Sequence, residues 1–202
     1  MRVIIDCDPG EDDCVALLVA LASPELDLVG ISVVAGNVPL AATLANACKI
    51  VGLSGRNDVP VRAGAAAPSV REQVFGKHAV IGAFGEDLVP AGTVRPDPED
   101  AISFLVRTAR EAAAQGIPLI ICAIGPLTNI ALALVQHPDV ARGIGRIVCM
   151  GGAFAALGYR TPWAEFNIYA DPHAAEIVFS SGIAMTLLPL DVTMQALFTG
   201  AH

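Results

Sequence analysis

The sequence is poor in positive charge and in aromatic side chains. Its 202 residues contain 12 Lys and Arg against 20 Asp and Glu, a formal net charge of −8, and only 5% aromatic residues. The basic residues are scattered singly, so no stretch could neutralise the phosphates of a nucleic acid or dock on an anionic membrane surface. The composition therefore argues against nucleic-acid and membrane partners.

An uninterrupted apolar run of membrane-spanning length is also missing. The most apolar segment, Ile117–Gln136, contains Gly125-Pro126, Thr128 and Asn129 at its centre. This pattern predicts a buried strand, a turn and a helix. Asp6 and Asp8 interrupt the N-terminal apolar run too early for a secretory signal. We expect a soluble, cytoplasmic protein.

The cysteines form no CxxC pair and no Cys/His cluster of the kind that binds zinc. There are five, an odd number, and they are widely spaced among apolar neighbours: Cys7, Cys14, Cys48, Cys122 and Cys149. This arrangement favours buried free thiols over disulfides. A catalytic thiol at Cys7 is the alternative.

Short β-rich runs alternate with helical patterns along the chain. The expected strands are 2–6, 26–36, 59–64, 118–125, 145–152 and 183–192, and the expected helices are 12–23, 39–55, 97–116, 126–137 and 171–182. Such alternation predicts an α/β fold with a mostly parallel central sheet and helices on both faces, an open Rossmann-like arrangement. We expect residues 1–202 to form a single domain, with 65–96 as a long functional loop.

Several helix ends carry their own signals. Asp97 is predicted to cap helix 97–116, with Pro98 in its first position and Gly116 at its end. Asp171 is predicted to cap helix 171–182. His137, which precedes Pro138, is expected to end helix 126–137.

The N-terminal stretch "VIIDCDPGEDD" is unusually acidic. Five carboxylates fall within the eight residues from Asp6 to Asp13. Such crowding raises carboxyl pKa values unless a positive charge lies among them. Carboxylate oxygens without soft ligands suit Ca²⁺ or Mg²⁺. Alternatively, Asp12 and Asp13 are ordinary acids at the start of a helix, favoured by its dipole.

The unusual polar residues follow the expected strands. They lie in "DCDPGEDD", "AGNVP", "AIGPLTN" and "GGAFAALGYRTPWAEFN". In open parallel sheets, ligands bind beyond the carboxyl ends of the strands. We therefore expect these four segments to converge on one site at that edge of the sheet.

Four motifs together resemble a known family. "DCDPGEDD", "VVAGN" ending in Asn37, "AIGPLTNIA" from Ala123 and "AEFNIYADP" from Ala164 resemble, in order and spacing, the inosine-uridine preferring nucleoside hydrolases. The similarity covers almost the whole chain. It implies the nucleoside hydrolase fold, and hydrolysis of the N-glycosidic bond of ribonucleosides to free base and ribose by a Ca²⁺-bound water. It also implies a homodimer or homotetramer.

The resemblance implies a metal site as well. Asp8 and Asp13 would hold Ca²⁺ together with the backbone carbonyl of Ile124. Asp8 would also take the proton from the metal-bound water, and Asp6 would support the site.

Other positions are implied to bind the nucleoside. Asp12 would accept hydrogen bonds from the ribose hydroxyls, and Asn37, Glu165 and Asn167 would bind the sugar. His78 lies in a partial match to the family's HGxxG-like stretch, with Ala79 in place of the first glycine. The match implies a catalytic or base-contacting role for His78. Trp163 is expected either to line the pocket or to belong to the core.

The match breaks at two places. Tyr159 stands where the family commonly has an Asn that contacts the 5′ hydroxyl, so the 5′ substituent or the substrate is expected to differ. Family members also continue well past the stretch that matches 189–193, whereas this sequence stops at His202. The resemblance thus implies the N-terminal portion of a hydrolase domain, without the His-Asp pair whose Asp completes the metal site, and hence weaker Ca²⁺ binding.

Two other functions stay open from the sequence. One is a catalytically impaired protein that binds nucleosides or ribose. The other is a phosphatase of the haloacid dehalogenase type, because "DCD" after a strand resembles its nucleophile motif. Against the phosphatase, Gly10 stands where that chemistry needs a small hydroxyl residue, and no lysine lies in a clear partner motif.

Overall fold

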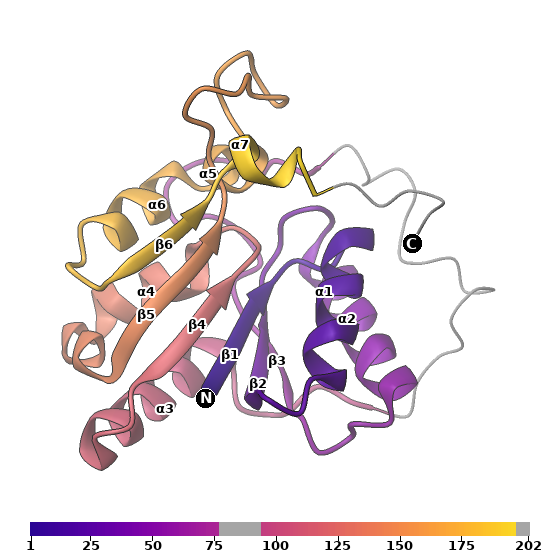
Figure 1. Cartoon of the computed structure of the whole chain (residues 1–202), viewed down its shortest axis with the longest axis vertical. Coiled ribbons are helices and arrows are strands. Elements are labelled where there is room, and N and C mark those ends of the chain that lie inside the picture. The colour runs from indigo at the N-terminus through magenta and orange to yellow at the C-terminus, as the bar shows by residue number, and fades with distance from the viewer. Residues whose placement is uncertain (77–93, 197–202) are drawn as a thin grey trace.

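A computed structural model describes residues 1–76 and 94–196 of the chain (Figure 1). Six strands pair side by side in the order β3-β2-β1-β4-β5-β6, and every pairing is parallel. The strands are β1 (Arg2–Cys7), β2 (Asp27–Val33), β3 (Val61–Ala63), β4 (Leu119–Ala123), β5 (Ile144–Met150) and β6 (Met185–Leu188). The predicted parallel α/β sheet is therefore confirmed.

Helices cover both faces of this sheet (Figure 1). One face packs against α1 (Glu11–Ala22) and α2 (Leu40–Ser54), and the other packs against α3 (Ala101–Gln115), α4 (Thr128–Gln136) and α6 (Pro172–Phe179). Three shorter helices complete the described chain: η2 (Pro138–Gly143), α5 (Phe166–Ala170) and α7 (Leu190–Thr193).

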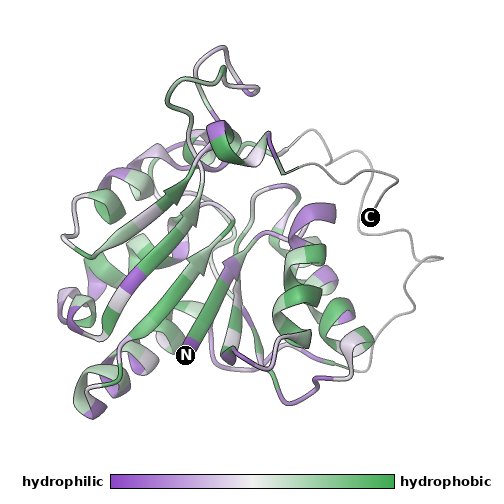
Figure 2. Cartoon of the chain, in the orientation of Figure 1, coloured by the Kyte–Doolittle hydropathy of each residue, from purple (hydrophilic) through white to green (hydrophobic). Residues whose placement is uncertain are grey.

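The central strands consist mostly of apolar residues, which appear in green in Figure 2. In β1, Val3 and Ile5 are buried against the α1 and α2 side, and Ile4 is buried against the α3 and α4 side. Side chains alternate between the faces of a strand, so a strand covered on both faces needs a continuous apolar run. This requirement explains why the sequence around Val3–Ile5 shows no alternation of polar and apolar residues.

The strand order places a switch point between β1 and β4. The chain moves outward from β1 through β2 to β3, and α3 then carries it back to β4 on the other side of β1. At such a point the connections after the two strands diverge and leave a crevice beyond their carboxyl ends. The acidic stretch follows β1 directly, so the fold positions it at this crevice.

The predicted boundaries at two elements were wrong. The helix predicted from Asp97 begins at Ala101, and its cap is Asp100, whose carboxylate accepts a hydrogen bond from the Ser103 backbone at 2.9 Å. Asp97 is engaged elsewhere, because its N–H donates to the carbonyl of Val61 at 2.8 Å.

The last predicted strand, 183–192, is also shorter than expected. β6 ends at Leu188, and Pro189 precedes a short helix, α7. Proline cannot donate a ladder hydrogen bond, and its fixed φ suits the start of a helix. The small helix α5 was not predicted, because it follows a polar loop without apolar periodicity.

The cysteines occur as free thiols. Four are buried, Cys122 is half-buried and none forms a disulfide. Burial, and then the negative charges of Asp13 and Asp6, raise the pKa of the Cys7 thiol well above its usual value. A thiol in this environment resists ionisation, which argues against the nucleophile alternative. In the described residues, no helix combines the length and apolar character needed to cross a bilayer, and Ile117–Gln136 forms β4, a turn and α4 as predicted.

Candidate active site

Asp8 lies at the end of β1 with almost no exposure to solvent. Its Oδ2 accepts a hydrogen bond from the Asn37 backbone at 2.7 Å. Glycines stand on both sides of it: a Cβ at Gly36 would overlap Oδ2 and come within 2.7 Å of Cγ, and a Cβ at Gly125 would lie 2.7 Å from Oδ1. The segments after β2 and β4 can therefore close around the Asp8 carboxylate only because these positions lack a side chain.

The start of α1 folds back onto Asp8. The Asp13 Oδ2 atom accepts a hydrogen bond from the Asp8 backbone at 2.9 Å, and Asp12 Oδ1 accepts one from the Asp13 backbone at 3.0 Å. Asp13 is buried, whereas Asp12 and Glu11 are exposed. The turn through Gly10, the N-cap of α1, thus places two buried carboxylates next to each other and a third at the surface.

These buried carboxylates resist ionisation. Burial, followed by the charge of the neighbouring acids, raises the pKa of Asp8 well above its ordinary value and raises that of Asp13 as well. Burial also raises the pKa of Asp6 to about 7. Asp6 Oδ1 accepts a hydrogen bond from Asn129 at 3.0 Å, but Oδ2 is buried without a hydrogen-bond partner. A cation among these groups would offset the unfavourable charge.

The donor atoms available here are those of a hard-cation site. Asp8, Asp13 and the carbonyl of Ile124 supply oxygen only, which is the chemistry that Ca²⁺ and Mg²⁺ prefer. Within residues 1–76 and 94–196, no group of three His, Cys, Asp or Glu side chains is placed to hold a metal by itself. Because Ca²⁺ takes about six to eight oxygens, waters and ligand hydroxyls would supply the remainder. The residues present fit such an ion.

One pocket of about 450 Å³ gathers the residues that the sequence indicated. All of the expected site residues that the structure describes line it: Asp8, Asp12, Asp13, Asn37, Ile124, Tyr159, Glu165 and Asn167. Its remaining walls are Ala16, Met150, Phe166, Leu190, Thr193 and Ala196. We call this space the main pocket. No Lys or Arg is among these lining residues. His78 lies outside the described residues.

Glu165 and Asn167 also organise the walls of the main pocket. The buried Glu165 carboxylate caps α5 by accepting hydrogen bonds from the backbones of Asn167 at 2.8 Å and Ile168 at 3.2 Å. It also accepts one from the Gly152 backbone at 3.0 Å. The Asn167 amide donates to the carbonyl of Ile124 at 2.8 Å. The last contact fixes the carbonyl of Ile124, a residue that lines the same pocket as Asp8.

Tyr159 and Trp163 differ in position. The Tyr159 hydroxyl donates to Glu165 Oε1 across 3.4 Å, and burial together with the Glu165 charge raises the pKa of this phenol. Trp163 is 81% exposed and does not line the main pocket, so both expectations for it were wrong. The His137 backbone donates to Ala133 at 2.9 Å and ends α4 as predicted.

Sequence reasoning missed a supporting role for Asn129. This buried amide donates to Asp6 Oδ1 and, across 3.3 Å, to the carbonyl of Val33, and it accepts a hydrogen bond from the Ala65 backbone at 2.8 Å. It thereby ties α4 to β1, to β2 and to the start of the loop after β3. The signal was present, because Asn129 belongs to the "AIGPLTN" segment, yet nothing in the sequence identified its partners.

Asp191 was missed as well. Its carboxylate accepts hydrogen bonds from the backbones of Phe154 and Ala155 at 2.8 Å and of Ala156 at 2.9 Å. These contacts hold the loop that leads to Tyr159. Asp191 was missed because it was expected to lie within the predicted strand 183–192.

The sequence model of the inosine-uridine preferring nucleoside hydrolases matches residues 3–202. The chain belongs to this family. A pyrimidine-specific ribonucleoside hydrolase, RihA, of Citrobacter koseri is 47% identical over 198 residues, which are 97% of this chain and 62% of that protein. An uncharacterized protein of Schizosaccharomyces pombe is also 47% identical, over 96% of this chain and 63% of its own length.

Solved structures agree with this membership in the nucleoside hydrolase family. The purine-preferring ribonucleoside hydrolase from Gardnerella vaginalis superposes with a TM-score of 0.90 at 35% identity, over 98% of this chain and 64% of that one. A plant nucleoside hydrolase superposes with a TM-score of 0.85 at 34% identity, over 99% of this chain and 63% of that one. The chain therefore spans less than two thirds of the length of these relatives. Because relatives with different base preferences share the fold, the fold by itself does not fix the substrate.

Proposed function

We propose that this chain carries the catalytic centre of a Ca²⁺-dependent ribonucleoside hydrolase, which splits the N-glycosidic bond to give free base and ribose. The observation that carries the proposal is the convergence of Asp8, Asp12 and Asp13 with Asn37 and Asn167 on the main pocket. Family membership supports the same reaction. Two of the relatives named above, those of Citrobacter koseri and Gardnerella vaginalis, are described as a pyrimidine-specific and a purine-preferring ribonucleoside hydrolase.

Asp8 is the residue that we assign to proton transfer. It is a buried carboxylate that lines the main pocket at the proposed cation site, which is where a metal-bound water would need a proton acceptor. Calcium bound by Asp8, Asp13 and the Ile124 carbonyl would make a water more acidic and hold ribose hydroxyls. The hydrogen bond from the Asn37 backbone fixes the orientation of the Asp8 carboxylate.

The other polar residues are assigned to the sugar. Breaking the glycosidic bond leaves positive charge on the ribose ring, in an oxocarbenium-like transition state. A wall of carboxylate and amide oxygens stabilises that charge where it develops. Asp12, Asn37, Glu165 and Asn167 provide such a wall. A catalytic or base-contacting role for His78 remains a prediction, as do a cytoplasmic location and a homodimer or homotetramer.

A protein that binds nucleosides without turnover is the second candidate. It is favoured by one observation: the described residues bring together fewer than three acidic, His or Cys side chains able to hold a metal. The phosphatase alternative loses its support, because the family match runs through residues 3–202.

One incubation series separates these functions. The chain is mixed with uridine, inosine or p-nitrophenyl phosphate, each with calcium and with EDTA. We expect free base from a ribonucleoside, lost on chelation and restored by calcium. Nucleoside binding without base release would support the second candidate, and phosphate release would support the phosphatase.

A further inference from the structure

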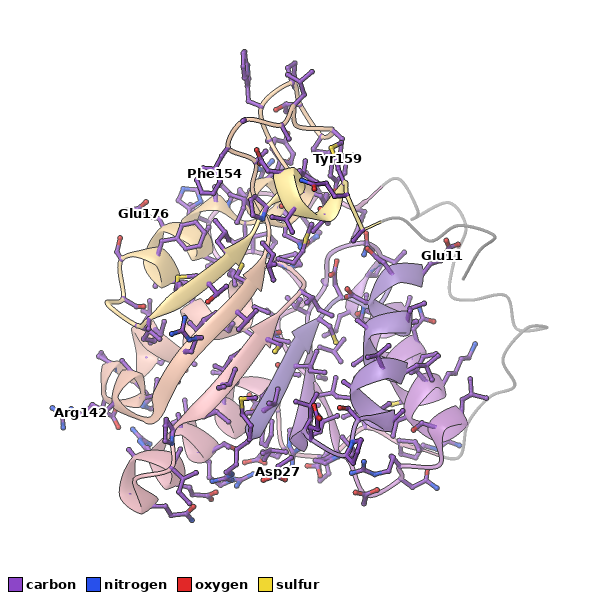
Figure 3. The ribbon with its side chains drawn as sticks, viewed as in Figure 1. Glu11, Asp27, Arg142, Phe154, Tyr159 and Glu176 are labelled. Carbon is purple, nitrogen blue, oxygen red and sulfur yellow. The ribbon has the colours of Figure 1, made fainter. Side chains whose placement is uncertain are left out.

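A second lobe adjoins the main pocket and, unlike the main pocket, is lined by an arginine. This lobe of about 340 Å³ shares Asp12, Asn37, Tyr159 and Phe166 with the main pocket, and it adds Gly10, Glu11, Gly76 and Arg160. Tyr159 and Glu11 lie toward the same end of the molecule, whereas Arg142 lies toward the opposite end (Figure 3). Arg160 is the cation among the residues that line either space.

The guanidinium of Arg160 has no carboxylate partner among the described residues. Its central carbon, Cζ, lies 6.0 Å from the centroid of the Phe166 ring and 5.7 Å from that of the Tyr169 ring. Its N–H donors are available to a ligand.

The local backbone holds Arg160 in place. The Arg160 N–H donates to the carbonyl of Ala164 at 3.1 Å, and the Gly158 N–H donates to that of Pro162 at 3.1 Å. The Thr161 hydroxyl accepts a hydrogen bond from the Ala164 backbone at 3.0 Å. These hydrogen bonds fix the backbone from which the Arg160 side chain projects.

We infer that Arg160 stabilises the nucleobase as it departs, an inference that rests on the proposed hydrolase activity. When the C1′–N bond breaks, its electron pair goes to the base nitrogen, and the C1′–O bond forms to the oxygen of water. One proton of that water passes to Asp8, and the base anion takes a proton from solvent. Glu11 and Asp12 line the same lobe and would repel the anion, and Arg160 supplies the opposing charge where it develops.

The test compares leaving groups in the R160Q variant. Uracil and hypoxanthine are poor leaving groups without help, whereas p-nitrophenolate is stable in water near neutral pH. We expect R160Q to lower kcat/KM for uridine and inosine by about 10²-fold, and to leave that for p-nitrophenyl riboside within about threefold of wild type. R160K, which keeps the charge, should retain most of the uridine activity. R142Q, at an exposed arginine far from the pocket, should match wild type.

Two results would overturn the inference: equal losses on all three ribosides, which indicate a general structural role, or no loss on any. If wild type with calcium leaves every riboside intact, the proposed function fails instead. In that case, the affinity for 5-nitrouracil, which is an anion near neutral pH, tests whether Arg160 stabilises an anionic base. Affinity about tenfold weaker in R160Q than in R142Q supports the inference, and equal affinities contradict it.

Discussion

At the scale of single residues, the site depends on how tightly the chain closes around Asp8. The carboxylate lies between the glycines that follow β2 and β4 and is oriented by the Asn37 backbone. Burying a carboxylate without a countercharge costs free energy, and such strongly perturbed groups cluster at functional sites. The acidic stretch was recognisable from the sequence because its charges are consecutive. The glycines were not recognisable as part of the site, because their role depends on contacts across the sheet.

The G36A variant tests this closure. An added Cβ overlaps the Asp8 carboxylate, so Asp8 must move, and we expect base release to fall at least about 10²-fold. Unfolding free energy should fall by about 1–3 kcal/mol, as measured by denaturant titration. G116A is the matched control: Gly116 ends α3 at a positive φ of 67° with open space around it. It should lose about 1 kcal/mol of stability and no activity. Unchanged activity in G36A would contradict the account.

At the scale of elements, the alternation of strands and helices was predictable, and some boundaries were not. Apolar runs and the caps at Gly116 and Asp171 carry local signals that the structure bears out. Asp97 and Asp100 are both acceptable caps by local chemistry, and a tertiary hydrogen bond from Asp97 to β3 decides between them. Boundaries fail where long-range contacts outweigh local preference.

The loop before Tyr159 gives a prediction at this scale. Backbone hydrogen bonds, that from Phe154 first, lower the pKa of Asp191 below its ordinary 3.8. A lowered pKa means that the stabilising carboxylate is fully present above about pH 4, and is lost as the pH falls through the folded-state value. We expect D191A to speed amide hydrogen exchange at Phe154–Ala156 at neutral pH. Wild type should lose the same protection only in acid, after correction for intrinsic exchange rates. The control D58A, at an exposed acid paired with Arg56, should leave the exchange protection of Phe154–Ala156 unchanged. Protection in D191A equal to that of wild type would refute the anchoring role of Asp191.

At the scale of the whole molecule, the sheet topology brings the site together. Asp8, Asn37 and Ile124 follow three adjacent strands, β1, β2 and β4, although they are far apart in sequence. The rule that ligands bind beyond the carboxyl ends of parallel strands predicted this convergence. The sequence could not predict the split into two lobes, because that division depends on how the loop carrying Tyr159 and Arg160 packs.

The central claim is that the buried carboxylates after β1 hold a hard cation, and titration calorimetry of calcium into the metal-free chain tests it most directly. We expect saturable binding by wild type and by the surface control D58N. Binding should be weakened at least about tenfold in D13N, which loses a charged oxygen ligand but keeps an acceptor for the Asp8 backbone. No calcium binding by wild type, or equal binding by D13N, would contradict the account.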